Sequence, residues 1–189
     1  METTNIVLCG LGGQGILFMT RVLAQAALNK GMNIMGAETH GMAQRGGSVV
    51  SHLRIGDIKG SLVRADSAHF LLALEENEGY RNLPFLAKGA RMYVNTNSQG
   101  FPREEVKTFL EKRGILFRSV PASSIAFELK VPMATNLALL GYFSAFAEGP
   151  FGDEEVRETV ENISPDRFKE KNLIVFDAGL GRGKEERAE

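Results

Sequence analysis

Two glycine-rich segments hold the residues whose types and spacing suit chemistry. The first, Gly10-Leu11-Gly12-Gly13-Gln14-Gly15, matches the pattern G-x-G-x-x-G. Between a strand and a helix, the first glycine of this pattern permits a tight turn and the second lets a phosphate approach. The third lets the helix pack closely on the strand. The residues that could bind a phosphate-bearing cofactor here are Gly10, Gly12, Gly13, Gln14 and Gly15.

Binding of a dinucleotide would also require an acidic residue at the end of the second strand, about 20 residues further along. Glu38 is the candidate, and it comes later in the chain than that spacing. Because a single G-x-G-x-x-G pattern is a weak signal, we favour a turn that builds the fold without binding a nucleotide. Both interpretations stay open on the residues alone.

The second segment runs from residue 40 to residue 48 and reads HGMAQRGGS. Beside Gly46 and Gly47, Arg45 can present a guanidinium and exposed backbone N–H groups to a phosphate or a carboxylate. Gln44 and His40 add neutral donors and acceptors. The alternative is a glycine hairpin that carries a surface arginine, and the residues do not decide between the two.

The remaining reactive side chains do not form a catalytic centre. The chain has one cysteine, Cys9, which excludes an internal disulfide, a Cys-based zinc site and a cluster held by four of its own thiolates. Its three histidines share no metal-ligand spacing, so we predict no metal site. Glu75 and Glu76 are interpreted as charges at the start of a helix. No Ser/His/Asp pattern and no P-loop lysine is present.

Composition narrows the class of protein further. The 189 residues include 22 Lys and Arg and 23 Asp and Glu, a net charge of −1, which argues against a nucleic-acid partner. No apolar run approaches the roughly 20 residues of a membrane span, and the first residues lack the basic region of a signal peptide. We therefore expect a cytoplasmic protein without a membrane segment.

The elements that must position the glycine segments follow from the apolar pattern. The run from Asn5 to Cys9 predicts a buried strand, residues 16–29 predict a helix that ends at Gly31, and residues 32–37 predict a second strand. A strand, a glycine loop, a helix and a strand in this order open a doubly wound α/β domain.

The rest of the chain continues this alternation. Residues 48–55 predict a half-exposed strand that turns at 56–60 into a short strand at 61–63, an inserted β-hairpin. Further strands are expected at 68–74, 91–95 and 115–120, and helices at 76–86, 103–112, 122–129, 134–147 and 153–162. Ser164-Pro165 predicts the start of a last helix that ends at Gly179. The predicted fold is a single Rossmann-like α/β domain, with a mainly parallel sheet and helices on both faces.

The order of the motifs resembles the gamma subunit of 2-oxoacid:ferredoxin oxidoreductases. The resemblance rests on the Gly10–Gly15 loop, Arg45-Gly46-Gly47, Ala65-Asp66, Leu72-Ala73-Leu74-Glu75, Val94-Asn95, and Asn136 to Gly141. Residues 40–49 are most similar to the indolepyruvate branch of this family, in its small (beta) subunit. The resemblance implies that residues 1–181 form a gamma-type catalytic domain. The charged residues 182–189 predict a flexible tail.

The resemblance also implies an activity and partners. A complex of this family oxidatively decarboxylates a 2-oxoacid with thiamine diphosphate, transfers the acyl group to coenzyme A as co-substrate, and passes electrons to ferredoxin through iron–sulfur clusters. In the indolepyruvate branch a large alpha subunit would hold the thiamine diphosphate and the clusters, so this chain would hold no cofactor and would be inactive alone. At the interface Arg45 would pair with a carboxylate or phosphate, and Gln44 would orient a polar group.

Other functions stay open. The chain could belong to a complex that acts on pyruvate, 2-oxoglutarate or 2-oxoisovalerate, because the 2-oxoacid specificity would lie largely in the partner. It could be a self-standing Rossmann oxidoreductase that binds a nicotinamide or flavin nucleotide through residues 10–15. It could also be an assembly module whose glycine loops only fit a partner surface.

Overall fold

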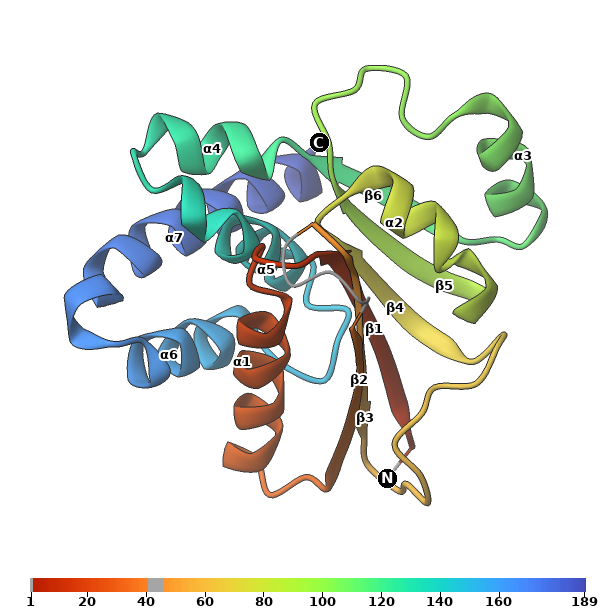
Figure 1. The fold of residues 1–189 in the computed structure, drawn as a ribbon, viewed down its shortest axis with the longest axis horizontal. Coiled ribbons are helices and arrows are strands. Elements are labelled where there is room, and N and C mark those ends of the chain that lie inside the picture. Colours follow the sequence, from red (N-terminus) through yellow and green to blue (C-terminus); the bar gives the residue numbers. More distant parts are fainter. Residues whose placement is uncertain (1, 41–45) are drawn as a thin grey trace.

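A six-stranded sheet with the strand order β2-β3-β1-β4-β5-β6 forms the middle layer of the protein (Figure 1). The structure is a computed structural model that describes residues 2–40 and 46–189, with the backbone alone at His40. The strands are β1 (Thr4–Leu11), β2 (Ile34–His40), β3 (Ser48–Ile55), β4 (Ala68–Ala73), β5 (Leu86–Asn95) and β6 (Leu116–Val120). The pairs β1–β4, β4–β5 and β5–β6 are parallel, whereas β3 pairs antiparallel with both β1 and β2.

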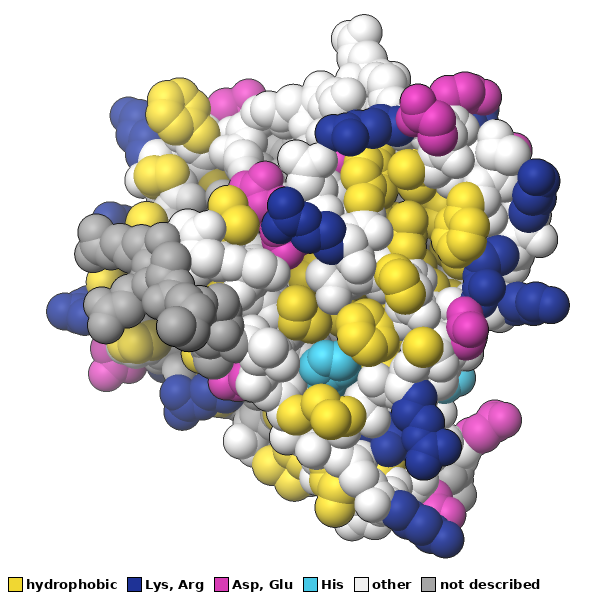
Figure 2. Space-filling model, turned by 45° about the vertical axis from the view of Figure 1, so that its right-hand side comes forward, with side chains coloured by type: hydrophobic (Ala, Val, Ile, Leu, Met, Phe, Trp, Pro, Cys, Tyr) yellow, Lys and Arg dark blue, Asp and Glu magenta, His cyan; other side chains and the backbone are white. Residues whose placement is uncertain are grey.

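Helices cover both faces of this sheet (Figure 1). The larger layer contains α1 (Ile16–Asn29), α4 (Ala122–Glu128), α5 (Thr135–Ala145), α6 (Asp153–Ile163) and α7 (Asp166–Ala188), with the 3-10 turn η2 (Pro132–Ala134) between α4 and α5. The smaller layer contains α2 (Glu76–Arg81), the 3-10 turn η1 (Leu83–Phe85) and α3 (Glu104–Lys112). Figure 2 shows the face with the smaller layer, where hydrophobic side chains gather near the centre and Lys and Arg lie mostly along the margin.

Strand β1 lies at the centre because its side chains are apolar on both faces. Ile6 and Leu8 belong to the core beneath the larger helix layer, while Val7 and Cys9 belong to the core beneath the smaller one. All four side chains are fully buried. A continuous apolar run suits a strand with helices on both sides. The predicted α/β fold, with a mainly parallel sheet and helices on both faces, is confirmed.

The inserted hairpin is present, but it is built from other strands than expected. β2 and β3 pair antiparallel from Ile34 with Ile55 to His40 with Val49, so the hairpin spans the second glycine segment rather than following it. The predicted short strand at 61–63 is wrong. Residues 61–63 instead cover the outer face of β3, where the Val63 N–H donates to Nδ1 of His52 (3.3 Å).

The burial of His52 makes the stability of the protein depend on pH. His52 is buried and meets Phe85 edge to face, with ring centroids 5.0 Å apart. Burial lowers the pKa of His52 below its ordinary value, so the unfolded chain takes up the proton at a higher pH than the folded chain. The contribution of His52 to the free energy of unfolding is therefore fully present above about pH 6.5 and is lost as the pH falls below that value.

We expect the His52→Asn variant to lose this dependence. Asn keeps an acceptor near the position of Nδ1 but does not titrate, so the slope of unfolding free energy between pH 5 and 7 should fall by up to about 1.4 kcal/mol per pH unit, the value for one proton. Urea unfolding at several pH values measures the slope. Equal slopes for the two proteins would show that another group titrates.

Helix α7 is longer than expected because its glycines pack rather than end it. A Cβ on Gly179 would lie 2.0 Å from the Ala138 carbonyl oxygen, and one on Gly141 would lie 2.1 Å from that of Phe176. These glycines let α5 and α7 touch along their backbones. The predicted helix end at Gly179 is therefore wrong, and residues 182–188, expected to form a separate tail, continue the helix.

Candidate functional site

The first glycine segment leads from β1 into α1, as its pattern predicts: Gly10 and Leu11 are the last residues of β1, and Gly12 to Gly15 form the turn. Gly13 and Gly15 have φ values of +100° and +81°, a region that side chains disfavour. At Gly10 a Cβ would lie 2.7 Å from Oε1 of Gln14. The backbone N–H groups of Gly13, Gly15 and Ile16 form no hydrogen bond within the described part of the chain. Such donors at a helix start suit an oxyanion.

The second glycine segment lies directly against the first. The Gly12 N–H donates to the Gly47 carbonyl (2.8 Å), and the Gly46 N–H donates to the Gly12 carbonyl (3.4 Å). The structure therefore brings together two segments that are more than 30 residues apart in the sequence. Gln44, Arg45 and the side chain of His40 lie outside the described residues, so the roles expected for Gln44 and Arg45 stay predictions.

Carboxylates at the start of α2 hold both segments in place. The Gln14 side chain accepts a hydrogen bond from the Leu11 N–H (2.8 Å) and donates one to Glu75 (2.5 Å). Ser48, the last residue of the second segment, donates to Glu78 (2.6 Å). The oxygen and the nitrogen of the Gln14 amide are thus both hydrogen-bonded within the protein, so Gln14 positions the loop.

Glu78 is the buried anchor of this arrangement. Its side chain is 2% exposed, and it forms an ion pair of 2.6 Å with Arg81. Sequence reasoning missed this residue because Ser48, the partner that links it to the second segment, lies on β3, 30 residues earlier in the chain. The one available signal, an acidic residue in a helix start, has a simpler explanation in the helix dipole.

An apolar pocket of about 540 Å³ opens beside Gly13 and Gly15. The Asn136 amide borders it and donates to the Gly15 carbonyl (3.1 Å). Met133 and Phe168 line it from η2 and α7 while remaining 78% and 45% exposed. The glycine loop therefore has an apolar hollow on one side and the second glycine segment on the other.

The described residues do not fit a metal or an iron–sulfur cluster. Cys9 is fully buried, and burial, together with the nearby charge of Glu78, raises the pKa of its thiol. A buried neutral thiol is neither a nucleophile nor a metal ligand. No group of three or more His, Cys, Asp or Glu side chains in the described ranges could hold a metal ion.

The position of Glu38 also argues against a dinucleotide in the first crevice. The acidic residue that binds a ribose must lie on the strand next to β1. Here β3 occupies that place. Glu38 lies on β2, one strand further out, where it pairs with Ser51 of β3. Glu38 therefore does not lie beside the glycine loop as that site requires.

Comparison with known proteins identifies the family. The model of the pyruvate ferredoxin/flavodoxin oxidoreductase family matches residues 5–181. The chain belongs to this family. It is 36% identical over 189 residues to the indolepyruvate oxidoreductase subunit IorB of Archaeoglobus fulgidus, covering 94% of each chain.

Solved structures of the family show the same fold. The gamma subunit of a keto/oxoacid ferredoxin oxidoreductase from Geobacter sulfurreducens matches with a TM-score of 0.74 at 21% identity, covering 96% of this chain and 99% of that one. A 2-oxoglutarate:ferredoxin oxidoreductase from Magnetococcus marinus matches with a TM-score of 0.77 at 21% identity, covering 98% of this chain but 32% of that one. The same fold therefore also occurs as one part of a longer chain.

Among the helices that the structure describes, none has the length and apolar character needed to cross a membrane.

Proposed function

We propose that this chain is the small subunit of an indolepyruvate:ferredoxin oxidoreductase. The observation that carries the proposal is the match to a named small subunit of that enzyme over 94% of both chains. The structure supports it with an edge lined by Gly13, Gly15, Gly46 and Gly47, the glycine-lined edge, which offers backbone N–H donors to a bound group.

We assign the cofactors to that partner, a large alpha subunit. Thiamine diphosphate, when bound there, supplies the electron sink that allows a 2-oxoacid to lose CO₂. Iron–sulfur clusters in the partner carry the two electrons to ferredoxin, and coenzyme A takes the acyl group. The single buried Cys9 supports this division, because this chain cannot ligate a cluster. We expect the isolated chain to be inactive. The free thiol of Cys9 suits the reducing cytoplasm, and so does ferredoxin as the electron acceptor of the complex.

We assign the glycine-lined edge to an anionic group at the interface, a carboxylate or a phosphate such as those of coenzyme A. Gly13 and Gly15 provide backbone donors without side chains in the way. Hydrogen bonds of Gly46 and Gly47 with Gly12 hold the second segment beside this loop, and Arg45 directly precedes Gly46 in the chain. Gln14 and Glu75 keep the loop in this shape. The contribution of this chain is thus to bind and orient, while the bond-breaking steps occur on the partner.

The Arg45→Ala variant tests this assignment in the assembled complex. We expect acyl-CoA formation to fall about 10- to 100-fold while the subunits still associate, because a charge-assisted hydrogen bond to the anion is lost. Arg21→Ala, on the exposed side of α1, is the matched control. Unchanged assembly and turnover would remove Arg45 from the site, and lost assembly with normal turnover per complex would make the segment an assembly contact.

An anaerobic affinity purification from the native cells tests the proposed function itself. We expect a large Cys-rich chain to co-purify and to reduce a viologen dye with indolepyruvate faster than with pyruvate, 2-oxoglutarate or 2-oxoisovalerate. Preference for one of those acids would assign the complex to another branch of the family. A single colourless chain that binds a nicotinamide or flavin nucleotide would support the self-standing alternative.

A further inference from the structure

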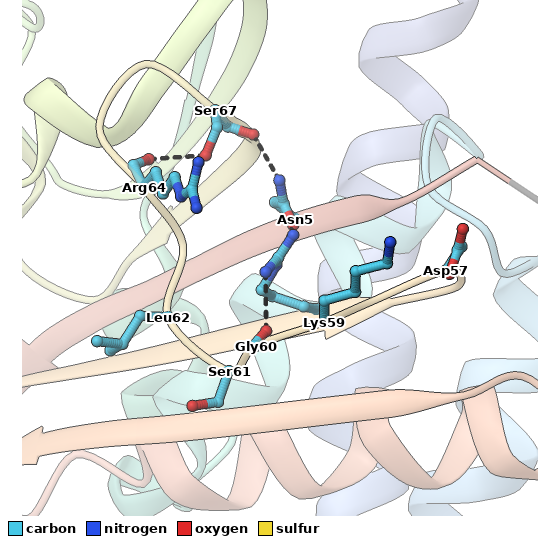
Figure 3. Close-up of a pocket in the computed structure, with 9 residues that line it drawn as sticks. Asn5, Asp57, Lys59, Gly60, Ser61, Leu62, Arg64 and Ser67 are labelled. Carbon is cyan, nitrogen blue, oxygen red and sulfur yellow. Dashed lines mark hydrogen bonds between the residues drawn. The ribbon is translucent and has the colours of Figure 1, made fainter.

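A cation-lined pocket lies at the edge of the sheet opposite the glycine loop, where β1 and β4 begin and β3 ends (Figure 3). Residues of the segment 57–67 line it together with Asn5 and Arg54. Its volume of about 680 Å³ is within the range of small-molecule sites. The pocket shares no residue with the glycine-lined edge, so it is independent of the proposed function.

Arg54 is held in this pocket by neutral groups. Its Nε donates to Oδ1 of Asn5 (2.9 Å), and its Nη1 donates to the Gly60 carbonyl (2.8 Å). Asn5 is itself buried and is fixed by a bond from its amide to the Ser67 carbonyl (2.9 Å). No carboxylate in the described residues pairs with Arg54. The guanidinium is therefore oriented and half-buried, with a full positive charge and further N–H donors to use.

Two more cations line the pocket. Lys59 and Arg64 are exposed, and neither forms an ion pair with any residue that the structure describes. Asp57 adds one carboxylate, which leaves an excess of positive charge, and in Figure 3 it lies at the end of the group away from Arg64. The Ser67 hydroxyl donates to the Arg64 carbonyl (2.7 Å) and closes the segment on itself.

We propose that this pocket binds a small organic oxyanion, a compound that carries a phosphoryl group or several carboxylates. Arg54 is the preorganised anchor, because a fixed guanidinium matches the two oxygens of such a group. Lys59 and Arg64 close around the remaining charge. Leu62, 60% exposed at the same pocket, contacts the carbon part of the ligand.

Calorimetric titration of the purified full-length chain tests the proposal with pyrophosphate and citrate as probes. We expect saturable binding to one site, weakened about tenfold by Arg54→Gln and by Arg64→Gln, the loss of one charge-assisted hydrogen bond. Asp57→Asn should instead strengthen binding several-fold, which damage to the fold cannot imitate. The anion that binds more tightly distinguishes a phosphoryl ligand from a carboxylate ligand.

The control is Arg21→Gln, an exposed cation on α1 beneath the other face of the sheet, which should bind both probes like the unchanged chain. Arg64→Gln and Asp57→Asn alter exposed positions, so we expect both variants to fold. They therefore test anion binding in this pocket even if Arg54→Gln does not fold. Absence of saturable binding at low salt would overturn the proposal. The same loss of affinity in Arg21→Gln as in Arg64→Gln would also overturn it.

Discussion

Gly179→Ala should lower the free energy of unfolding by about 3 kcal/mol or more, at the upper end of what overpacking costs. The new methyl group would lie 2.0 Å from the carbonyl oxygen of Ala138. That oxygen belongs to the backbone of α5, so the two helices must separate to admit it. Gly141→Ala should act in the same way from the other helix, because its Cβ would meet the backbone of Phe176 at 2.1 Å. Urea unfolding of each variant measures the effect.

Gly181→Ala provides the matched control two residues along the same helix. A Cβ there meets no atom within 4 Å, and alanine is the better helix former by about 0.5–1 kcal/mol. The control should therefore be as stable as the unchanged chain or more stable. Similar destabilisation by Gly179→Ala and Gly181→Ala would contradict the close packing of α5 on α7.

Gly15→Ala should damage both the fold and the activity of the complex. The backbone at residue 15 has φ +81°, and a Cβ there would lie 2.5 Å from Nδ2 of Asn136. We expect a loss of about 2–4 kcal/mol, from backbone strain of about 1–2 kcal/mol and from displacement of the Asn136 side chain. Acyl-CoA formation should fall as well, because the loop then loses the shape that presents its N–H groups.

Two variants separate the strain from the overlap. Gly13→Ala has a positive φ but open space around its Cβ, so it should show only the strain. Asn136→Ala removes the side chain that the new methyl group of Gly15→Ala would overlap. The double variant Gly15→Ala/Asn136→Ala should therefore be less destabilised than the sum of the single variants. Additive losses would mean that Asn136 does not contact residue 15.

Local patterns in the sequence were enough for the first half of the site. The apolar run to Cys9, the glycine loop and the helix at 16–29 are short-range features, and the helix bounds agree with the structure. Gly31, expected after that helix, has the positive φ of +69° that such a position needs. The glycine pattern therefore placed Gly15 correctly at the start of the helix, whereas Gly10, expected in the turn, lies within β1, where it pairs with Val49.

Long-range contacts could not be predicted in this way. The pairing of Gly12 with Gly46 and Gly47 depends on β3 running between β1 and β2, and no local pattern specifies that order. The residue type of Gly179 is compatible both with a helix end and with close packing of two helices, so the sequence does not distinguish the two roles. Its role depends on Ala138, which lies 41 residues earlier in the sequence.

Adding this chain back to the large subunit that we propose as its partner tests the proposed function most directly. The large subunit is purified alone under anaerobic conditions, this chain is titrated into it, and formation of acyl-CoA from indolepyruvate and coenzyme A is measured with ferredoxin as acceptor. We expect almost no activity from either chain alone, and activity that rises with added chain and saturates at a fixed molar ratio. A large subunit that is fully active without this chain would contradict the account.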